Sequence, residues 1–212
     1  MARNDTLIQD AKARAQMYHF LAAVYLAPPT PALVEELRKL GLIDTDDLEN
    51  VKREFNDLFV VPLGRYTTPY EAVYRDEREI AGERVRGLLM GPSTVDVIGR
   101  YKAAGAEMDQ MVKELPDHVG VELAFMGFLC ERESDALKNG DESLVRELRT
   151  RQAEFLNDHL QPWVPLLAQR IREKARIEFY KGLASLTEDT VRESLEFLGG
   201  DLGSCEQSSI VS

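Results

Sequence analysis

Asp117 and His118 are adjacent acidic and imidazole side chains, and Glu122 follows His118 by four positions. An Asp-His pair can act as a general base with its orienting partner, while a His and a Glu at this spacing can ligate a metal from one helix face. Either chemistry also needs a nucleophile or a fuller ligand set, and the sequence marks neither near the pair. We therefore expect no catalytic residue, no metal and no other cofactor, and a small helical hydrolase is the less favoured alternative.

The Asp-His pair stands at the start of an apolar stretch that is typical of a central helix. Pro116 fixes its own φ and disfavours helix at Leu115, so we expect a helix from Asp117 to about Lys138. A carboxylate at a helix start accepts bonds from free N–H groups and interacts favourably with the helix dipole. The simplest interpretation is structural, with Asp117 as an N-cap and His118 as a surface histidine whose hydrogen bonds are satisfied.

Helical periodicity dominates the rest of the chain, and no alternating β pattern of useful length appears. We expect an all-α fold with one compact domain over residues 1–198 and a mobile Gly- and Ser-rich tail over 199–212. Pro69 is expected to begin a short element after a loop. The expected helices span about 7–25, 31–40, 45–59, 75–90, 93–104, 107–113, 117–138, 142–160, 162–174 and 177–198.

Charge and composition narrow the classes of partner. A formal net charge of −11 disfavours nucleic acid, whose phosphates need a basic surface, and favours a basic partner such as an Arg-rich peptide. With only Cys130 and Cys205, cysteine can supply neither a disulfide framework nor a four-ligand zinc site. The polar N-terminus lacks the features of an export signal, and no apolar run suffices to cross a bilayer. We expect a cytoplasmic protein without membrane insertion.

The Pro116-Asp117-His118 segment, followed by Glu122-Leu123-Ala124-Phe125-Met126, resembles a motif of the TorD/DmsD family of redox-enzyme maturation chaperones, which are related to the NarJ-type chaperones. Four further segments resemble the family in the same order. They are Arg14 to Pro28, Glu54 to Pro62 with Pro69 to Tyr74, Phe155 to Pro165, and Glu178 to Ala184. The resemblance covers roughly residues 14–198.

The resemblance implies a compact helical, non-enzymatic chaperone. Such a protein would bind the N-terminal twin-arginine signal region of a molybdopterin oxidoreductase subunit precursor and assist folding and cofactor insertion before export. A NarJ-like chaperone for a subunit that stays in the cytoplasm is the alternative. The candidate signal-peptide-binding residues combine carboxylates with an apolar wall, and Asp117 and His118 would orient the groove: Tyr70, Glu71, Tyr74, Asp76, Asp117, His118, Glu122 and Phe125.

The oligomeric state has two alternatives on sequence grounds. Helical domains joined by a short hinge can exchange elements between protomers, and the segment from Gly105 to Pro116 is a candidate hinge before the apolar helix. We therefore expect either a monomer or a domain-swapped dimer.

Overall fold

The computed structural model describes residues 2–39, 48–81 and 83–208. It confirms a mainly helical fold, to which one two-stranded sheet is added. The predicted start of the third helix at Thr45 lies outside the described residues. The elements in chain order are α1 (Ala2–Leu26), α2 (Pro31–Lys39), α3 (Leu48–Phe55), α4 (Glu71–Arg75), β1 (Glu77–Ile80), β2 (Glu83–Arg86), α5 (Pro92–Ala103), α6 (Val119–Asn139), α7 (Glu142–Phe155), α8 (Gln161–Lys174) and α9 (Glu178–Ser208), with π-helical turns at Asn56–Val60 and Leu156–Leu160.

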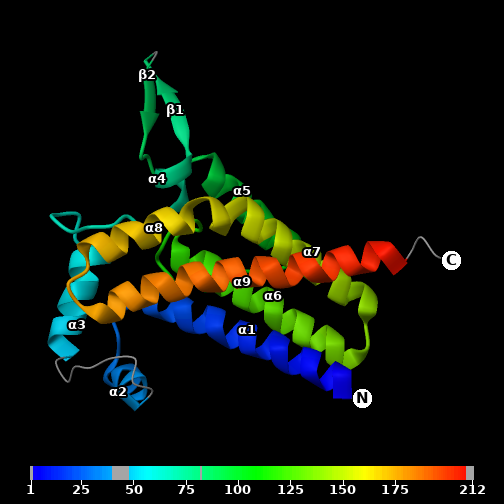
Figure 1. Ribbon diagram of the computed structural model, residues 1–212. Coiled ribbons are helices and arrows are strands. Elements are labelled where there is room, and N and C mark those ends of the chain that lie inside the picture. The colour runs from blue at the N-terminus through cyan, green and yellow to red at the C-terminus, as the bar shows by residue number, and fades with distance from the viewer. Residues whose placement is uncertain (1, 40–47, 82, 209–212) are drawn as a thin grey trace.

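Helices α1 and α6 form the central pair of the fold and run antiparallel along most of their length (Figure 1). Two glycines of α6 permit this close approach. A Cβ at Gly120 would stand 2.6 Å from Cγ of Leu26, and one at Gly127 would stand 2.6 Å from the ring of His19. A larger residue at Gly120 would also crowd the backbone carbonyl of Ala22, 3.1 Å from such a Cβ, whereas at Gly127 the atoms met belong to the His19 side chain alone.

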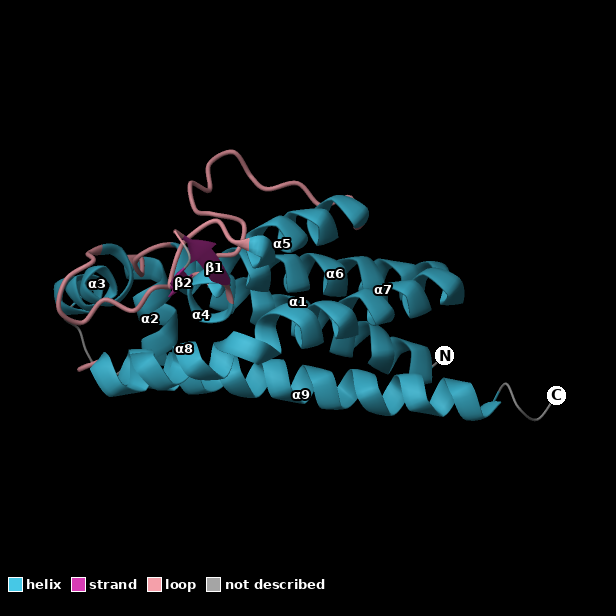
Figure 2. Cartoon of the chain, turned by 90° about the horizontal axis from the view of Figure 1, so that it is seen from above, coloured by secondary structure: helices cyan, strands magenta, loops and turns pink. Residues whose placement is uncertain are grey.

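Helices α8 and α9 form a second antiparallel pair that lies against the first (Figure 2). Helix α9 is tied to α1 by two buried hydrogen bonds. The hydroxyl of Tyr18 donates to Oγ of Ser194 at 2.8 Å, and the hydroxyls of Tyr25 and Thr187 lie 3.1 Å apart. The buried hydroxyls of Tyr18 and Tyr25 thus have partners on α9.

A buried ionic cluster joins α1, α6 and α7. Both carboxylate oxygens of Glu133 accept charged hydrogen bonds, Oε2 from Nη2 of Arg14 at 2.7 Å and Oε1 from Nε of Arg149 at 2.7 Å. Nε2 of Gln152 also donates to Oε2 at 2.8 Å. Burial alone would raise the pKa of Glu133, but the charge of Arg14 and the added hydrogen bonds lower it overall.

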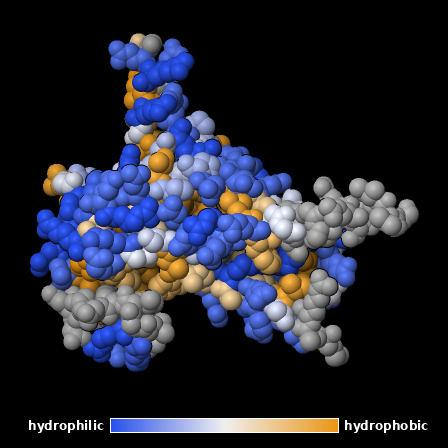
Figure 3. Space-filling model, viewed as in Figure 1, coloured by the Kyte–Doolittle hydropathy of each residue, from blue (hydrophilic) through white to orange (hydrophobic). Residues whose placement is uncertain are grey.

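The expected helix over 75–90 and the expected lack of strands are both wrong. Residues 77–80 and 83–86 form an antiparallel pair of strands, the hairpin, in which Glu77 pairs with Arg86 and Ile80 with Glu83. It projects from the helical body (Figure 1). Its side chains are mostly hydrophilic (Figure 3), because both faces of the ribbon meet solvent and neither needs the apolar stripe by which strands are usually found.

Two further expectations on helix limits are wrong. The segment 107–113 contains no helix or strand, so the connection from α5 to α6 lacks regular structure over 106–118. Helix α9 continues to Ser208, beyond the expected end at Leu198, and residues 209–212 of the expected tail lie outside the described residues. Among the helices that the structure describes, none has the length and apolar character that a membrane span requires.

Candidate functional site

The segment before α4 lies antiparallel to the segment before α6. The N–H of Glu71 donates to the carbonyl of Asp117 at 2.9 Å, and the N–H of Val119 donates to the carbonyl of Pro69 at 2.9 Å. These two bonds make a single bridge between Tyr70 and His118. We call the region formed by residues 69–76 and 114–122 the α4–α6 junction.

His118 caps the central helix at this junction. Helix α6 begins at Val119, and Nδ1 of His118 accepts a hydrogen bond from the backbone N–H of Gly120 at 3.0 Å. The imidazole packs edge-to-face on the ring of Tyr70, with 5.2 Å between ring centroids. Burial lowers the pKa of His118 to about 4, so the ring is neutral at neutral pH and retains the lone pair that the cap requires. The expectation of a surface histidine is wrong.

Asp117 caps a different helix from the one expected. Its Oδ2 accepts a hydrogen bond from the N–H of Ala72 at 3.1 Å, in the first turn of α4. The side chain is 0% exposed. Burial raises the pKa of Asp117, although the N–H of Ala72 acts in the opposite direction. The assignment of Asp117 as the N-cap of the apolar helix is therefore wrong, because His118 takes that position.

Two more buried carboxyl groups lie at the junction. Oε2 of Glu71 lies 3.0 Å from Nδ1 of His159, and its Oε1 pairs with the guanidinium of Arg75. Oε2 of Glu122 accepts a hydrogen bond from the indole N–H of Trp163 at 3.2 Å. Burial, and then the charge of Glu71, raise the pKa of Glu122 well above its usual range. The protonated form of Glu122 is therefore favoured beside the ion-paired Glu71.

Tyr70 and Tyr74 are the half-buried members of the junction. The hydroxyl of Tyr70 donates to Oε2 of Glu114 at 2.5 Å. The ring of Tyr74 lies 5.3 Å from that of Trp163, and the guanidinium of Arg170 stands 4.5 Å from its centroid. Burial raises the pKa of Tyr74 to about 12. Both tyrosines are partly accessible to solvent, whereas Glu71, Asp117 and Glu122 are 0% exposed.

Of the remaining two predicted residues, Asp76 is at the end of the junction segment 69–76 and Phe125 lies beyond the junction. Asp76 caps α5, because its two oxygens accept from the backbone N–H of Ser93 at 3.0 Å and from its hydroxyl at 2.6 Å. Phe125 is buried one helical turn beyond Glu122, with its ring centroid 4.6 Å from that of Tyr101 and 4.8 Å from that of Phe155.

The structure thus brings together most of the predicted residues, but their carboxyl groups are buried in the interior. Tyr70, Glu71, Tyr74, Asp117, His118 and Glu122 meet at the junction. Glu71, Asp117 and Glu122 are 0% exposed, so these three candidate carboxylates do not lie open at the surface. Their part in signal-peptide binding stays a prediction.

Sequence reasoning missed two residues that complete the junction. His159 pairs with Glu71, and Trp163 bonds Glu122. Both belong to a segment that resembles the family, and Trp163 is the only tryptophan of the chain, which marked it for attention. Within the part of the chain that the structure describes, no group of three or more His, Cys, Asp or Glu side chains could hold a metal ion.

Comparison with known proteins agrees with this architecture. The chain is 30% identical over 169 residues to the chlorate reductase assembly chaperone protein of Ideonella dechloratans, covering 79% of this chain and 81% of the relative. It is 26% identical over 192 residues to the chaperone protein TorD of Shewanella loihica, covering 91% and 82%. A crystal structure of a redox enzyme maturation protein from Archaeoglobus fulgidus shares the fold, with a TM-score of 0.52, 17% identity and coverage of 84% and 93%.

The sequence model of the nitrate reductase delta subunit family matches residues 25–169, which include the whole α4–α6 junction. The relatives are named as chaperones and not as catalysts, so the hydrolase alternative is wrong. The chain belongs to the nitrate reductase delta subunit family, and it is a redox-enzyme maturation chaperone of the TorD/NarJ type.

Proposed function

We propose that this chain binds the N-terminal twin-arginine signal region of a molybdopterin oxidoreductase catalytic subunit in the cytoplasm. It holds that precursor back from export while the subunit folds and receives its cofactor. The observation that carries the proposal is the similarity to an assembly chaperone of a reductase over 79% of the chain. The net charge of −11 supports a partner with a basic segment.

In this proposal the two halves of the junction have different tasks. Asp117 and His118 act from the interior, because their caps and the bridge at Tyr70 fix α4 against the start of α6. Tyr70 and Tyr74 face outward in part and contact the apolar section of the signal region. Asp117 and His118 are then positioning residues for the two tyrosines.

The free-energy contributions of ion pairs and of apolar burial differ in size, and they favour apolar contact as the main source of affinity. Exposed ion pairs contribute about 0.2–1 kcal/mol each, so two arginines supply at most about 2 kcal/mol. Burial of roughly 400 Å² of apolar surface supplies about 10 kcal/mol before an association cost of at least about 4 kcal/mol. The sum corresponds to a dissociation constant on the order of micromolar. Charge then sets specificity and register more than strength.

Cofactor content of the client tests the maturation role. The molybdoenzyme subunit encoded nearest to this gene is produced with and without this chain, and molybdenum is measured per mole of purified subunit. The proposal expects a clear loss of molybdenum without the chaperone, and a partial loss when Tyr70 and Tyr74 are both replaced by Ser. Full molybdenum content in the absence of the chaperone would reject the proposal.

A NarJ-like role for a subunit that is not exported is the second candidate, and the match to the nitrate reductase delta subunit family favours it. The N-terminus of the client separates the two candidates. If that subunit begins without an Arg-Arg export signal, the role in export control is excluded while the maturation role survives.

A further inference from the structure

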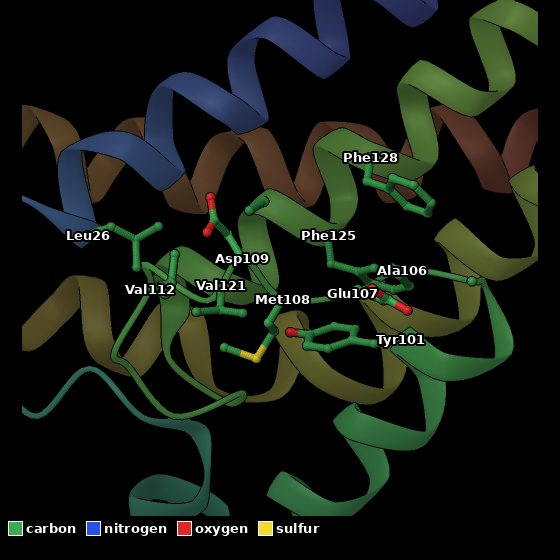
Figure 4. Close-up of a pocket in the computed structure, with 12 residues that line it drawn as sticks. Leu26, Tyr101, Ala106, Glu107, Met108, Asp109, Val112, Val121, Phe125 and Phe128 are labelled. Atoms are coloured by element: carbon green, nitrogen blue, oxygen red, sulfur yellow. The ribbon is translucent and has the colours of Figure 1, made fainter.

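An open groove lies beside the α4–α6 junction, bounded by the ends of α1 and α5, the segment 105–112 and the first turns of α6 (Figure 4). Its volume is about 430 Å³. Most of its wall is apolar, with Leu26, Met108, Val112, Val121, Phe125 and Phe128 around it. We call it the 105–112 groove. Its size and lining are those of a binding pocket for a ligand with several apolar groups.

The floor of the groove is fixed by the fold. Phe125 is held in the core between Tyr101 and Phe155, and the hydroxyl of Tyr101 donates to the carbonyl of Pro116 at 2.9 Å. A ligand therefore finds a pre-formed aromatic floor and does not pay to order it.

The opposite wall differs from the floor, because the segment 106–112 contains no helix or strand. Met108 lines this wall and is half-buried against the core. Methionine is unbranched and polarizable, and it adapts to varied apolar partners. The wall is therefore suited to client segments that differ in sequence.

The charged side chains at the groove are acidic. Glu107 and Asp109 lie among its lining residues, and within the part of the chain that the structure describes no Lys or Arg lines it. An apolar segment with basic residues at one end complements such a groove, because its apolar part is buried while its basic part meets the two carboxylates. A second copy of this chain does not, because an isologous contact would bring two acidic rims together on chains of net charge −11.

The lining residues belong to helices and to a segment without strands, so the groove offers no strand edge to which an extended peptide could add. The largely apolar wall suits the helix-in-groove mode, in which a helix lays its apolar face into a hydrophobic groove. We propose that the 105–112 groove receives, as a short helix, the apolar segment that follows the arginine pair of the client, with Glu107 and Asp109 facing the arginines. This inference rests on the proposed function and names a binding surface for it.

Methionine methyl signals report occupancy of the groove directly. The full chain is labelled with ¹³C-methyl methionine and titrated with a synthetic peptide that covers the signal region of the adjacent molybdoenzyme subunit. Met108→Leu assigns the groove signal. We expect the Met108 signal to shift on saturation, while the signal of Met90, at the base of the hairpin outside the groove, stays in place.

Matched variants test the affinity that the groove supplies. Ala124→Gln places a longer polar side chain in the groove from a half-buried position, and Ala32→Gln makes the same change on the exposed face of α2. Because a blocked central pocket costs far more than a surface change, we expect binding to weaken at least about tenfold for the first and less than about twofold for the second.

We call Glu107 and Asp109 the acidic rim. Two double variants, each of which removes two negative charges, test its contribution to binding. Glu107→Gln with Asp109→Asn removes the rim charges, and Asp5→Asn with Asp10→Asn removes the same charge from exposed positions near the other end of α1. We expect the rim variant to bind about three- to tenfold more weakly at low salt, with a smaller loss at high salt. The control should bind within about twofold of the wild type.

The two proposals fail in different ways. If the wild-type chain binds no signal-region peptide, the proposed function fails and the groove loses its occupant. If the wild type binds while Ala124→Gln and the rim variant keep full affinity and the Met108 signal stays unmoved, the groove inference is overturned and the proposed function stands.

Discussion

Oδ2 of Asp117 accepts a hydrogen bond from the backbone N–H of Ala72 at 3.1 Å, and this bond links the start of α4 to the start of the central helix across 45 positions of sequence. The carbonyl of the same residue accepts from the N–H of Glu71 at 2.9 Å. Asp117 thus satisfies two consecutive N–H groups of another segment. Its task in the fold is to hold the segment that carries Tyr70 and Tyr74.

The first prediction concerns this cap. Asp117→Ala should lower the free energy of unfolding by about 1–2 kcal/mol, because the N–H of Ala72 loses its acceptor. Asp117→Asn keeps an acceptor oxygen in nearly the same place and should cost less than half as much. Urea unfolding of the three proteins measures both differences. An Asn variant as unstable as the Ala variant would show that the charge, and not the acceptor, matters.

The second prediction is a pH dependence that comes from His118. The unfolded chain protonates this residue near its ordinary pKa of 6.5, while the folded chain keeps it neutral down to about 4. The unfolded state therefore binds more protons in this window, so stability falls as the pH is lowered through it. The loss attributable to His118 should be about 2 kcal/mol between about pH 7 and pH 5.

His118→Asn isolates that contribution, because Asn also caps helices well but does not titrate. Urea unfolding at the two pH values should show a weaker pH dependence for the variant by about the same 2 kcal/mol. Equal pH dependence in both proteins would mean that His118 is not buried in its neutral form.

The third prediction concerns Glu122, whose pKa is raised by burial and then by the charge of Glu71. The folded chain binds this proton more tightly than the unfolded chain, so its contribution to stability is present at low pH and is lost as the pH rises through the folded pKa. Glu122→Gln mimics the protonated form. Its stability relative to the wild type should therefore increase from about pH 5 to about pH 8 in urea unfolding.

Glu122→Ala is the contrasting variant. It leaves the indole N–H of Trp163 without its acceptor and should cost about 1–3 kcal/mol from that loss alone. A Gln variant whose stability relative to the wild type decreases with pH would contradict the protonated state of Glu122.

The fourth prediction concerns the ionic cluster around Glu133. Glu133→Ala leaves Arg14 and Arg149 buried without the carboxylate that each contacts at 2.7 Å, and should cost about 3–5 kcal/mol. The matched control is Glu131→Ala on the same helix, where the side chain is 60% exposed and pairs with His19. The control should cost less than about 1 kcal/mol by urea unfolding. Similar losses for both variants would show that the cluster contributes little.

The sequence predicted the helices that bury a continuous apolar face. The expected limits of the apolar helix, 117–138, lie within two residues of α6 at Val119–Asn139, because Pro116 and Gly140 stop it on either side. Gly140 has φ of 69°, a left-handed conformation that glycine adopts readily at a helix end. Local chemistry was sufficient for such elements.

Features that depend on distant contacts were missed. Asp117 is a good N-cap by local rules, and only the arrival of Ala72 from 45 positions away gives its carboxylate another donor. The hairpin was not predicted for a different reason. Its residues alternate in charge rather than in polarity, and the contact between Glu77 and Arg86 replaces the apolar packing that marks a buried strand.

The candidate site also depends on contacts between residues that are distant in sequence. The resemblance named residues that do meet at one junction, but no pattern in the sequence showed that three of their carboxyl groups would be buried there. The 105–112 groove was also not foreseen, because its lining comes from α1, α5, α6 and a segment that was expected to be helical. Grooves arise from how elements pack, and periodicity does not encode that.

Calorimetric titration of the full chain with signal-region peptides tests the central claim most directly. Peptides from the molybdoenzyme subunits encoded in the same genome are compared with versions in which both arginines are replaced by glutamine. We predict that at least one native peptide binds with a dissociation constant on the order of micromolar, and that its Gln version binds several-fold more weakly at low salt. Absence of binding to every native peptide would contradict the account.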